Sequence, residues 1–265
     1  MLEDLSGATR VLFIVGDPIA QVKSPAGVTE MLRARGLDAI VVPAHVAAPD
    51  LPLWIAAVTS MRNCDGLIVT VPHKFALLPQ CAEVSPAARS IGAVNVMRRS
   101  ASGAWFGDML DGAGYVSGLR QAGCDVTGKS ALLVGAGGAG SAIAHALVDA
   151  GVAALALHEA DEARRETLAC KLTSYGRVRP TRGSADPSGF DLVINATPMG
   201  MQAGDPLPID AEHLNAATFV GDVVTLPALP PLIAAARARG CATMTGTQMF
   251  EAVRDRMVDF FLRNA

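Results

Sequence analysis

Residues 130–151 read SALLVGAGGAGSAIAHALVDAG, and this stretch decides which fold the chain is expected to adopt. An apolar run ends at a glycine-rich turn, and a segment with the apolar spacing of a helix follows. Gly135, Gly137 and Gly140 form a G-x-G-x-x-G pattern in its required place between strand and helix. The first glycine permits a tight turn, the second lets a pyrophosphate approach the backbone, and the third lets helix and strand pack closely. The stretch therefore favours a dinucleotide-binding site, with close packing alone or S-adenosylmethionine binding as the alternatives.

Cofactor contacts are predicted from this turn and from the strand that follows it. Unpaired amides at the helix start would bind the phosphates, so the expected contacts in the turn are Gly135, Ala136, Gly137, Gly138, Ala139 and Gly140. Glu159 ends the next strand, where a carboxylate accepts hydrogen bonds from the adenosine ribose. An NADP site would favour a basic side chain there, and Arg164 and Arg165 come only in the next helix. The sequence predicts NAD, with NADP as the alternative; Glu159 has a second interpretation, as an acid favoured by a helix dipole.

Short β-branched runs alternate with longer alanine-rich segments along the chain, which is typical of βαβ units around a parallel sheet. Strands are expected at 11–15, 39–44, 66–71, 130–135, 153–158, 191–196 and 218–224. Helices are expected at 25–35, 50–61, 113–122, 138–150, 161–174, 228–239 and 247–263. The character of the sequence changes near residue 110. We expect an α/β fold of two domains that meet in the sequence at that point.

The composition excludes several classes of function. Of the 265 residues, 51% are apolar and 18% are charged, which is typical of a folded globule. A net charge of −3 without a basic block leaves no electrostatic footprint for nucleic acid, so a small-molecule partner is expected. No apolar window is long enough for a membrane helix, and the acidic N-terminus does not resemble a signal peptide. We expect a cytoplasmic protein, a monomer or a homodimer, that binds no membrane.

The cysteines predict neither disulfides nor metal binding. They are odd in number and scattered, without a CxxC pair or a neighbouring histidine at ligand spacing. The set is Cys64, Cys81, Cys124, Cys170 and Cys241. We expect buried, reduced thiols and no metal site.

Residues 66–74 read GLIVTVPHK and place a lysine directly after an apolar run. A solvated surface charge is the usual state of a lone lysine. However, strand ends in open α/β sheets face the ligand crevice. Oxidation of a secondary alcohol requires a base within hydrogen-bond reach of its hydroxyl, and a partly desolvated lysine serves that purpose. Lys74 is therefore a candidate acid/base group.

Three further stretches complete a recognisable set. They are GDPIAQVKSP (16–25), IGAVNV (91–96) and FGDMLDG (106–112). Followed in order by VGAGGAG and INATPMG, the set resembles the shikimate and quinate dehydrogenase family over essentially the whole chain. The resemblance implies hydride transfer between a ring alcohol carbon and a nicotinamide. It also implies a substrate-binding, catalytic domain of residues 1–110 and 246–265, and a Rossmann NAD(P)-binding domain of residues 111–245.

The resemblance also implies roles for individual residues. Lys74 and Asp111 match the family's catalytic pair. The polar positions that match its substrate contacts are Ser24, Thr70 and Asn95. In the cofactor half, Asn195 and Thr197 match a loop beside the nicotinamide, and Gly246 matches the glycine that begins the last helix. Other interpretations exist: Asn95 would cap a turn, Thr70 would be an ordinary strand residue, and Asp108 is expected to be a turn acid.

This sequence departs from the family mainly at substrate contacts. Apolar or shorter residues stand where members have serine, asparagine, threonine, tyrosine and glutamine, namely Val22, Met109, Leu110, Thr225 and Val253. A buried polar group left without its partner costs about 1–3 kcal/mol. We therefore expect a polyhydroxy substrate other than shikimate, a cyclic alcohol or hydroxy acid in which the acid group differs, with quinate as an alternative.

Two other functions compete with a dehydrogenase. A non-catalytic, NAD-responsive binding protein on the same fold is the first, because fold does not determine function. The retained Lys74 and Asp111 argue against it. A methyltransferase is the second, and the two-domain order and the INAT segment argue against it.

Overall fold

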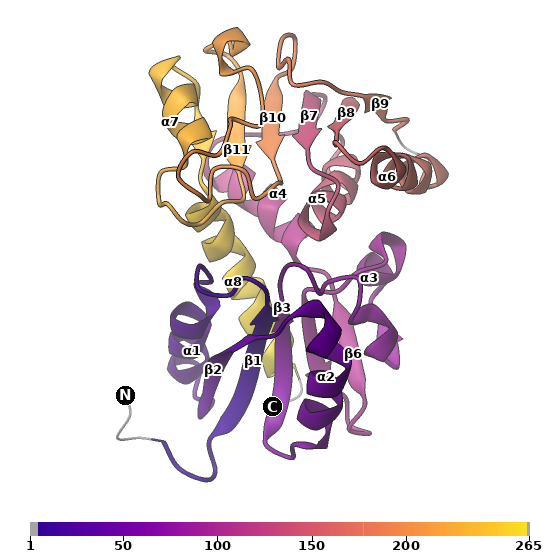
Figure 1. Cartoon of the computed structure of the whole chain (residues 1–265), viewed down its shortest axis with the longest axis vertical. Coiled ribbons are helices and arrows are strands. Elements are labelled where there is room, and N and C mark those ends of the chain that lie inside the picture. Colours follow the sequence, from indigo (N-terminus) through magenta and orange to yellow (C-terminus); the bar gives the residue numbers. More distant parts are fainter. Residues whose placement is uncertain (1–4, 177, 264–265) are drawn as a thin grey trace. The chain divides into compact units, whose positions relative to one another are not determined.

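The computed structural model describes residues 5–176 and 178–263. Contacts within the chain divide it into two compact units: residues up to Leu110 together with those from Arg254, and Asp111–Val253. Within the described residues each unit has one six-stranded sheet (Figure 1). The chain passes from one unit to the other at two points, and the second, between Val253 and Arg254, lies inside the last helix. The domain ranges predicted from the family stay a prediction.

The first unit is a sheet with helices on its two faces. Its strands are β1 (Arg10–Gly16), β2 (Ala39–His45), β3 (Cys64–Val69), β4 (Glu83–Val84), β5 (Val96–Arg99) and β6 (Trp105–Asp108). Its helices are α1 (Ser24–Ala34), η1 (Ala48–Asp50), α2 (Leu51–Ser60), η2 (Leu78–Gln80), α3 (Pro86–Ile91) and the end of α8 (Gly246–Leu262). The strand order is β2-β1-β3-β5-β6-β4.

Alternation along β1 explains how both faces are covered. The Phe13 ring packs edge-on against Trp54 of α2, with 5.9 Å between ring centroids. The neighbouring pair in register, Leu12 and Gly66, belongs to the other face, because successive strand residues point to opposite sides. There Gly66 leaves room for Phe261 of α8, which a Cβ would approach to 2.5 Å. The core of the first unit therefore lies on both sides of β1 and β3.

The first sheet is mixed rather than wholly parallel. β1 pairs in parallel with β2 and with β3, as the βαβ pattern predicts. β5 runs antiparallel to β3 and to β6, which the sequence did not predict. The short link between β5 and β6 explains the difference, because a parallel connection needs about a dozen residues or more. The hairpin brings the start of β5 beside the carboxyl end of β3.

The second unit is an all-parallel, doubly wound sheet. Its strands are β7 (Ser130–Val134), β8 (Ala154–His158), β9 (Thr181–Arg182), β10 (Leu192–Asn195), β11 (Phe219–Asp222) and β12 (Thr243–Met244). Its helices are α4 (Asp111–Gln121), α5 (Gly138–Asp149), α6 (Glu162–Ser174), η3 (Ala211–His213), α7 (Pro231–Ala238) and the start of α8. The order β12-β11-β10-β7-β8-β9 reverses direction between β7 and β10, which is the Rossmann arrangement.

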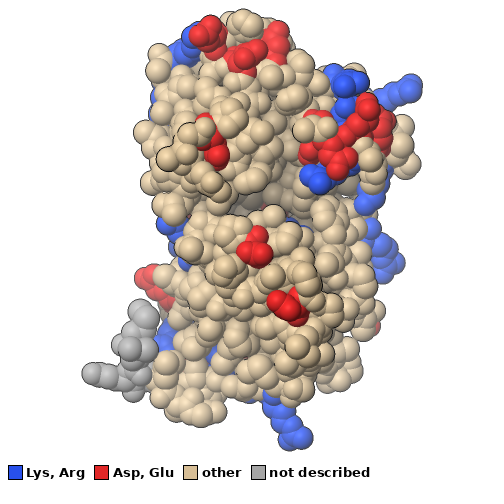
Figure 2. All heavy atoms as spheres, viewed as in Figure 1, with Lys and Arg blue, Asp and Glu red and all other residues tan. Residues whose placement is uncertain are grey.

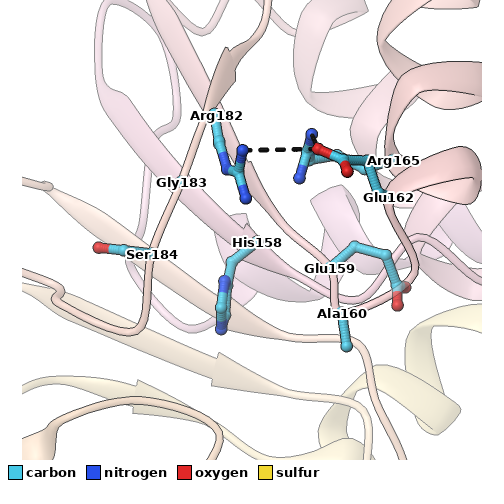
Figure 3. A pocket seen from close by; sticks show the side chains of 8 residues that line it. All are labelled: His158, Glu159, Ala160, Glu162, Arg165, Arg182, Gly183 and Ser184. Carbon is cyan, nitrogen blue, oxygen red and sulfur yellow. Dashed lines mark hydrogen bonds and ion pairs between the residues drawn. The ribbon is translucent and has the colours of Figure 1, made fainter.

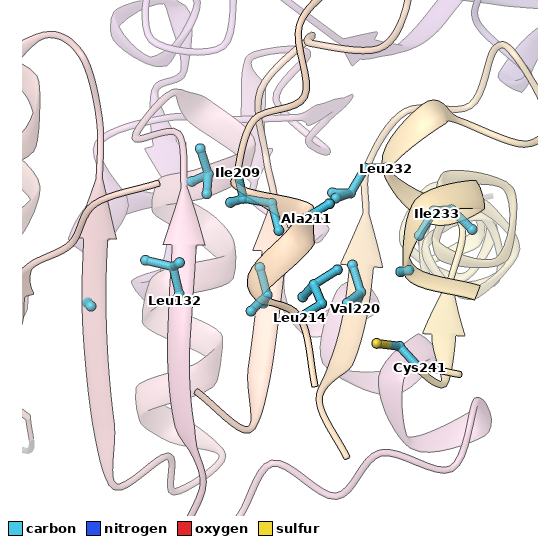
Figure 4. Packing of buried hydrophobic residues seen from close by; sticks show 12 residues of the cluster. Leu132, Ile209, Ala211, Leu214, Val220, Leu232, Ile233 and Cys241 are labelled. Carbon is cyan, nitrogen blue, oxygen red and sulfur yellow. The ribbon is translucent and has the colours of Figure 1, made fainter. Parts of the chain in front are cut away.

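One rung of this sheet carries much of its core. Ala156, Leu132, Val193 and Val220 pair in register across four strands and are buried. Side chains from η3 and α7 converge on them (Figure 4). The rung therefore ties helix and sheet together a few residues before the strands reach their carboxyl ends.

Helix α4 packs closely on its neighbours through three glycines. A Cβ on Gly112 would lie 2.1 Å from the Ala142 carbonyl oxygen of α5, and one on Gly114 would lie 2.3 Å from Val253 of α8. A Cβ on Gly118 would lie 2.9 Å from the Met244 sulfur. These close contacts, one with backbone and two with side chains, fix the position of the helix that begins at Asp111.

The seven strands and seven helices expected from the sequence are confirmed, with ends shifted by at most three residues. β3 ends at Val69 instead of residue 71, and a turn follows in which the His73 amide donates to the Thr70 carbonyl over 2.9 Å. The elements that the sequence did not predict are short: η1, η2, η3, β4, α3, β5, β6, β9 and β12. No helix among the described residues is both long and apolar enough to cross a membrane.

The thiols of all five cysteines are free. Burial raises the pKa of Cys64 and Cys81 to about 11. Cys170 is exposed, so the expectation that every thiol is buried is wrong. It lies on α6, whose outer face is polar and open to solvent.

Candidate functional site

The carboxyl ends of β1 and β3 form a polar edge in the first unit. Both strands are parallel and adjacent, so their ends lie together. β2 lies on the other side of β1, which makes the β1/β3 pair the point where the order of the strands reverses. In open α/β sheets ligands bind outside the carboxyl ends of strands at such a point. This edge is the candidate substrate site.

Asn95 ties three chain segments together at this edge. It is buried, its amide donates to the Asp108 carbonyl over 2.9 Å, and its carbonyl accepts from the Val69 amide over 2.7 Å. Its side-chain Oδ1 accepts from the Leu110 amide over 2.8 Å. The alternative interpretation of Asn95 as a turn cap is therefore partly correct. Asp108 accepts from the Met109 amide over 2.7 Å and from the Ser85 hydroxyl, so it is the turn acid expected.

Lys74 lies in a turn that the chain holds from several directions. The Lys74 carbonyl accepts from the Val94 amide over 2.9 Å, beside Asn95. The preceding residue, His73, is buried, and its Nε2 lies 2.7 Å from the Val46 carbonyl oxygen. Its amide donates to the Thr70 carbonyl over 2.9 Å. His73 thus fastens the turn that carries the half-buried Lys74, a role that sequence reasoning missed.

Further predicted residues lie on the same edge. A Cβ on Gly16, the last residue of β1, would lie 2.3 Å from the Thr70 methyl group and 2.9 Å from the Val71 carbonyl oxygen, so this glycine packs directly against the segment after β3. Ser24 is buried at the start of α1, and Val22 is half-buried in the loop before it. The first unit thus gathers five of the predicted residues at one sheet edge: Val22, Ser24, Thr70, Lys74 and Asn95.

The three fingerprint glycines of the second unit have three different surroundings. Gly135 has a φ of +98°, and a Cβ there would lie 2.8 Å from the Thr197 methyl group. A Cβ on Gly140 would lie 2.0 Å from the Gly135 carbonyl oxygen, so helix and strand are in direct backbone contact. A Cβ on Gly137 would meet no atom within 4 Å. The turn is thus tight at its two ends and open in the middle, where a pyrophosphate would approach.

The helix start beside Gly137 is arranged to bind anions. The Ser141 amide makes the first bond of α5, to the Gly137 carbonyl over 2.8 Å. The amides of Gly138, Ala139 and Gly140 precede that bond, and amides in this position bind phosphate groups. The residues present therefore fit a dinucleotide cofactor.

Glu159 lies next to this turn, as the sequence predicts for an acid that ends the second strand. Its Oε2 accepts from the Ala136 amide over 2.8 Å, and its Oε1 accepts from the Asp161 amide over 3.0 Å. Arg164 lies 3.7 Å from the same carboxylate. The carboxylate is therefore held against the glycine turn at Ala136.

A hollow of about 370 Å³ opens at the carboxyl ends of β8 and β9 (Figure 3). Its wall includes Glu159, Arg182 and Ser184. Glu162 stands between two arginines there, 2.9 Å from Arg165 and 3.5 Å from Arg182, and these contacts lower the pKa of its carboxyl group. Figure 2 shows acidic and basic side chains intermixed over the α6 region, while most of that face is uncharged. The two guanidinium groups of the hollow are thus paired with a carboxylate.

Asn195 and Thr197 are brought together, but Asn195 is fully buried and its amide is used within the protein. Its Oδ1 accepts from the Thr197 amide over 3.0 Å and from the Thr197 hydroxyl over 2.6 Å. Its Nδ2 donates to the Met199 carbonyl and to Asp222, each over 3.1 Å. Thr197, in turn, lies over Gly135. Asn195 therefore orders the loop from inside, and Thr197 lies on the side of the glycine turn.

The remaining predicted residues are in the second unit. Asp111 is buried as the first residue of α4, and Thr225 is half-buried after β11. Val253 is buried against Gly114. A Cβ on Gly246 would lie 2.3 Å from the Val224 carbonyl oxygen, so this glycine makes room for the protein's own backbone.

Sequence reasoning also missed Asp222, which ends β11 and is fully buried. Burial raises the pKa of its carboxyl group to about 7, while hydrogen bonds from Val224, Asn195 and Val223 act in the opposite direction. An acidic residue inside the apolar run TFVGDVV was the available signal. Among the described residues, no cluster of histidine, cysteine or acidic side chains is arranged to hold a metal ion.

Comparisons with known proteins agree over nearly the whole chain. Residues 14–97 match the family model described as the shikimate dehydrogenase substrate binding domain. The shikimate dehydrogenase (NADP(+)) of Rhodospirillum rubrum is 35% identical over 252 residues, covering 92% of this chain and 89% of that protein.

Two solved structures are similar in both fold and sequence. The quinate dehydrogenase of Corynebacterium glutamicum in complex with NAD has a TM-score of 0.84 and 31% identity, covering 96% of this chain and 93% of that one. The ligand-free 5-ketofructose reductase of Gluconobacter sp. strain CHM43 has a TM-score of 0.83 and 28% identity, covering 97% and 94%.

The glycine turn gives a pair of opposite expectations. Gly140→Ala places a methyl group against backbone, so we expect it to lower stability by about 1–3 kcal/mol, measured as a lower Tm. Gly137→Ala meets no atom and keeps an allowed φ of −70°, so Tm stays unchanged while NAD affinity, measured by calorimetry, falls. Unchanged NAD affinity in Gly137→Ala would contradict the assignment of this turn.

Proposed function

This chain belongs to the shikimate dehydrogenase family, and we propose that it is an NAD-dependent dehydrogenase of a polyhydroxy compound. The observation that carries the proposal is the open middle of the glycine turn at Gly137, at a helix start beside the reversal point of a doubly wound sheet. The polar edge of the first unit, which includes Thr70, Lys74 and Asn95, supplies the groups that an alcohol substrate requires.

The proposed chemistry assigns a role to each of these groups. The nicotinamide, when bound, accepts the hydride. Lys74 removes the hydroxyl proton during oxidation and returns it during reduction. Asp111 is the second member of the catalytic pair by its match to the family. The turn around Lys74 is held by His73 and Val94, and this supports a lysine with a defined position.

The proposed substrate is a polyhydroxy alcohol that lacks the carboxylate contacts of shikimate. Two of the positions that match substrate contacts are valines, Val22 and Val253, which have no hydroxyl or amide. At the third position, Thr225 has a hydroxyl on a shorter side chain than the tyrosine of family members. Val253 packs against Gly114, which supports a structural use of that position in this chain. The name of one structural neighbour, 5-ketofructose reductase, specifies a keto sugar, and this supports a substrate without an acid group.

The proposed cofactor is NAD, although the curated relative is named for NADP(+). The carboxylate of Glu159 stands beside the glycine turn, where a ribose hydroxyl would be bound and a phosphate repelled. Arg165 and Arg182 are the basic groups of the adjoining hollow, and Glu162 pairs with both. A neighbour of 31% identity is in complex with NAD, which supports the same choice.

A substrate panel tests the proposal. With NAD, and with formation of reduced nicotinamide followed by absorbance, we expect a non-carboxylated ketose or cyclitol to give a kcat/KM about tenfold or more above that of shikimate, because two or three lost hydrogen bonds cost about 1–3 kcal/mol each. Val22→Ser should raise kcat/KM for shikimate only. A wild-type protein that prefers shikimate would overturn the substrate assignment. If the protein oxidises none of the alcohols in the panel, the assignment of dehydrogenase activity is wrong.

Removal of the proposed base separates chemistry from cofactor binding. Lys74→Ala should lower kcat by roughly 10²–10⁴, the usual contribution of a positioned acid/base group, without changing the Kd for NAD. The matched control is Lys171→Ala, an exposed lysine on α6, which should behave as wild type. Near-normal turnover in Lys74→Ala would refute the assignment.

The cofactor preference is expected to depend on Glu162. Glu162→Gln leaves Arg165 and Arg182 without that carboxylate, so the affinity for NADP should rise by about tenfold while the affinity for NAD stays the same. Glu166→Gln is the control, because Glu166 pairs with Arg165 but does not line the hollow. Thermal shift with each cofactor provides the measurement. A wild-type protein stabilised more by NADP than by NAD would contradict the preference.

A further inference from the structure

Asp222 is a buried carboxylate in an apolar strand, and among the described residues it forms no ion pair. Its Oδ1 accepts from the Val224 amide over 2.9 Å and from Asn195 Nδ2 over 3.1 Å. Its Oδ2 has no hydrogen-bond partner within the described part of the chain. Burying such a group is costly, so its position calls for a reason beyond packing.

The carboxylate is one of the groups that fix which way the Asn195 amide points. A carboxylate oxygen without a proton only accepts, so the Asn195 nitrogen must face Asp222. The Asn195 oxygen is then directed to Thr197, where it accepts from both the amide and the hydroxyl. If the Asn195 amide were reversed, its oxygen would face the Asp222 carboxylate oxygen, and its NH₂ group would face the N–H donor of Thr197. Asp222 thus supports this orientation of a residue 27 positions away in sequence, together with the Met199 carbonyl, which accepts from the same Nδ2 over 3.1 Å.

The orientation of Asn195 is transmitted to the loop that follows β10. The Thr197 hydroxyl donates to Asn195 and accepts from the Met199 amide over 3.1 Å. The Thr197 methyl group is thereby held over Gly135, the first glycine of the turn. Segment 195–199, here called the β10 loop, is therefore positioned on the glycine turn by bonds that begin at Asp222.

The same carboxylate holds a second segment. The Val224 amide bonds to Asp222, and the Val223 amide bonds to the Asn195 carbonyl over 3.1 Å. Gly246, the first residue of α8, packs against the Val223 and Val224 carbonyls. Asp222 therefore connects the β10 loop, the segment after β11 and the start of α8.

The topology indicates which half of the cofactor lies at the β10 loop. A dinucleotide lies across the reversal point of the sheet, with one half on each side of β7. Glu159 follows β8 on one side, and its carboxylate belongs to the adenosine half. β10 is on the opposite side of β7, so its loop belongs to the nicotinamide half.

We propose that Asp222 is a positioning residue for the nicotinamide half of NAD, acting through Asn195 on the β10 loop. This inference rests on the proposed function. Asp222 touches neither cofactor nor substrate in this role. What it supplies is a second acceptor for the Asn195 Nδ2, beside the Met199 carbonyl, which holds the amide that bonds to Thr197.

The acceptor rather than the charge is the required feature. Oδ1 makes the two bonds, and Oδ2 has no partner among the described residues, so a proton on Oδ2 leaves both bonds in place. Two side chains adjoin the Asp222 carboxyl group. One is Tyr115 of α4, whose hydroxyl fills the space beside Gly221, and the other is the uncharged Asn195 of β10. Burial, and secondarily Asp222, raises the pKa of Tyr115 well above its usual value, so it stays neutral. Asparagine at position 222 should therefore substitute for aspartate.

Calorimetry with two ligands tests the inference. NAD carries the nicotinamide ring and ADP-ribose lacks it, so a positioning role affects only the first. For Asp222→Ala we expect a Kd for NAD about tenfold higher and a Kd for ADP-ribose within about twofold of wild type. Asp222→Asn should bind both ligands as wild type does. Asp125→Asn, an exposed acid before β7, is the control and should change neither Kd.

Each other outcome has a defined meaning. Asp222→Ala that binds NAD as tightly as wild type overturns the inference, as does an equal loss of affinity for both ligands, because that result indicates general damage to the unit. Should Asp222→Ala not fold, Thr197→Val decides: it keeps a methyl group over Gly135 and removes the hydroxyl, so NAD affinity alone should fall. Wild-type protein that binds neither NAD nor NADP overturns the proposed function itself.

Discussion

Each unit depends on one constraint: a central strand with parallel strands on both sides. β1 lies between β2 and β3, and β7 lies between β8 and β10. Parallel pairing places the carboxyl ends of these strands at one edge. The connections run to opposite sides of the central strand, so a gap remains between them at that edge. Because polar residues follow these strands, they accumulate at that edge in each unit without any need for a long, specialised loop.

Backbone contact is the second theme of the fold. Gly16, Gly112, Gly135, Gly140 and Gly246 each lie where a Cβ would approach another atom to 2.8 Å or less. Such contacts bring strand ends and helix starts close enough for amides and carbonyls to be shared between segments. Gly137 is different because its surroundings are open. A glycine is thus informative only when the surroundings of the missing side chain are known.

Buried polar residues perform the positioning in both units. Asn95 receives the Leu110 amide, His73 contacts the Val46 carbonyl, and Asp222 orients Asn195. Asn95 and His73 are satisfied by the backbone of a segment distant in sequence, and Asp222 bonds to a distant side chain and to the nearby Val224 amide. The residues proposed to meet substrate or cofactor, such as Lys74 and Thr197, lie in turns held by these contacts. Positioning and chemistry are thus assigned to different residues.

The sequence by itself determined the two kinds of element, the glycine turn, the acid after β8 and the family, because these depend on residues near one another in the chain. It missed the β5–β6 hairpin, whose strands are four residues long and which joins the sheet through the pairing of β5 with β3. Only the tertiary structure decided that Gly137 is open while Gly140 is packed, that Glu162 pairs with Arg182, and that Asn195 donates to Asp222. The Glu162–Arg182 and Asn195–Asp222 contacts join residues 20 or more positions apart, and no local pattern encodes such a distance.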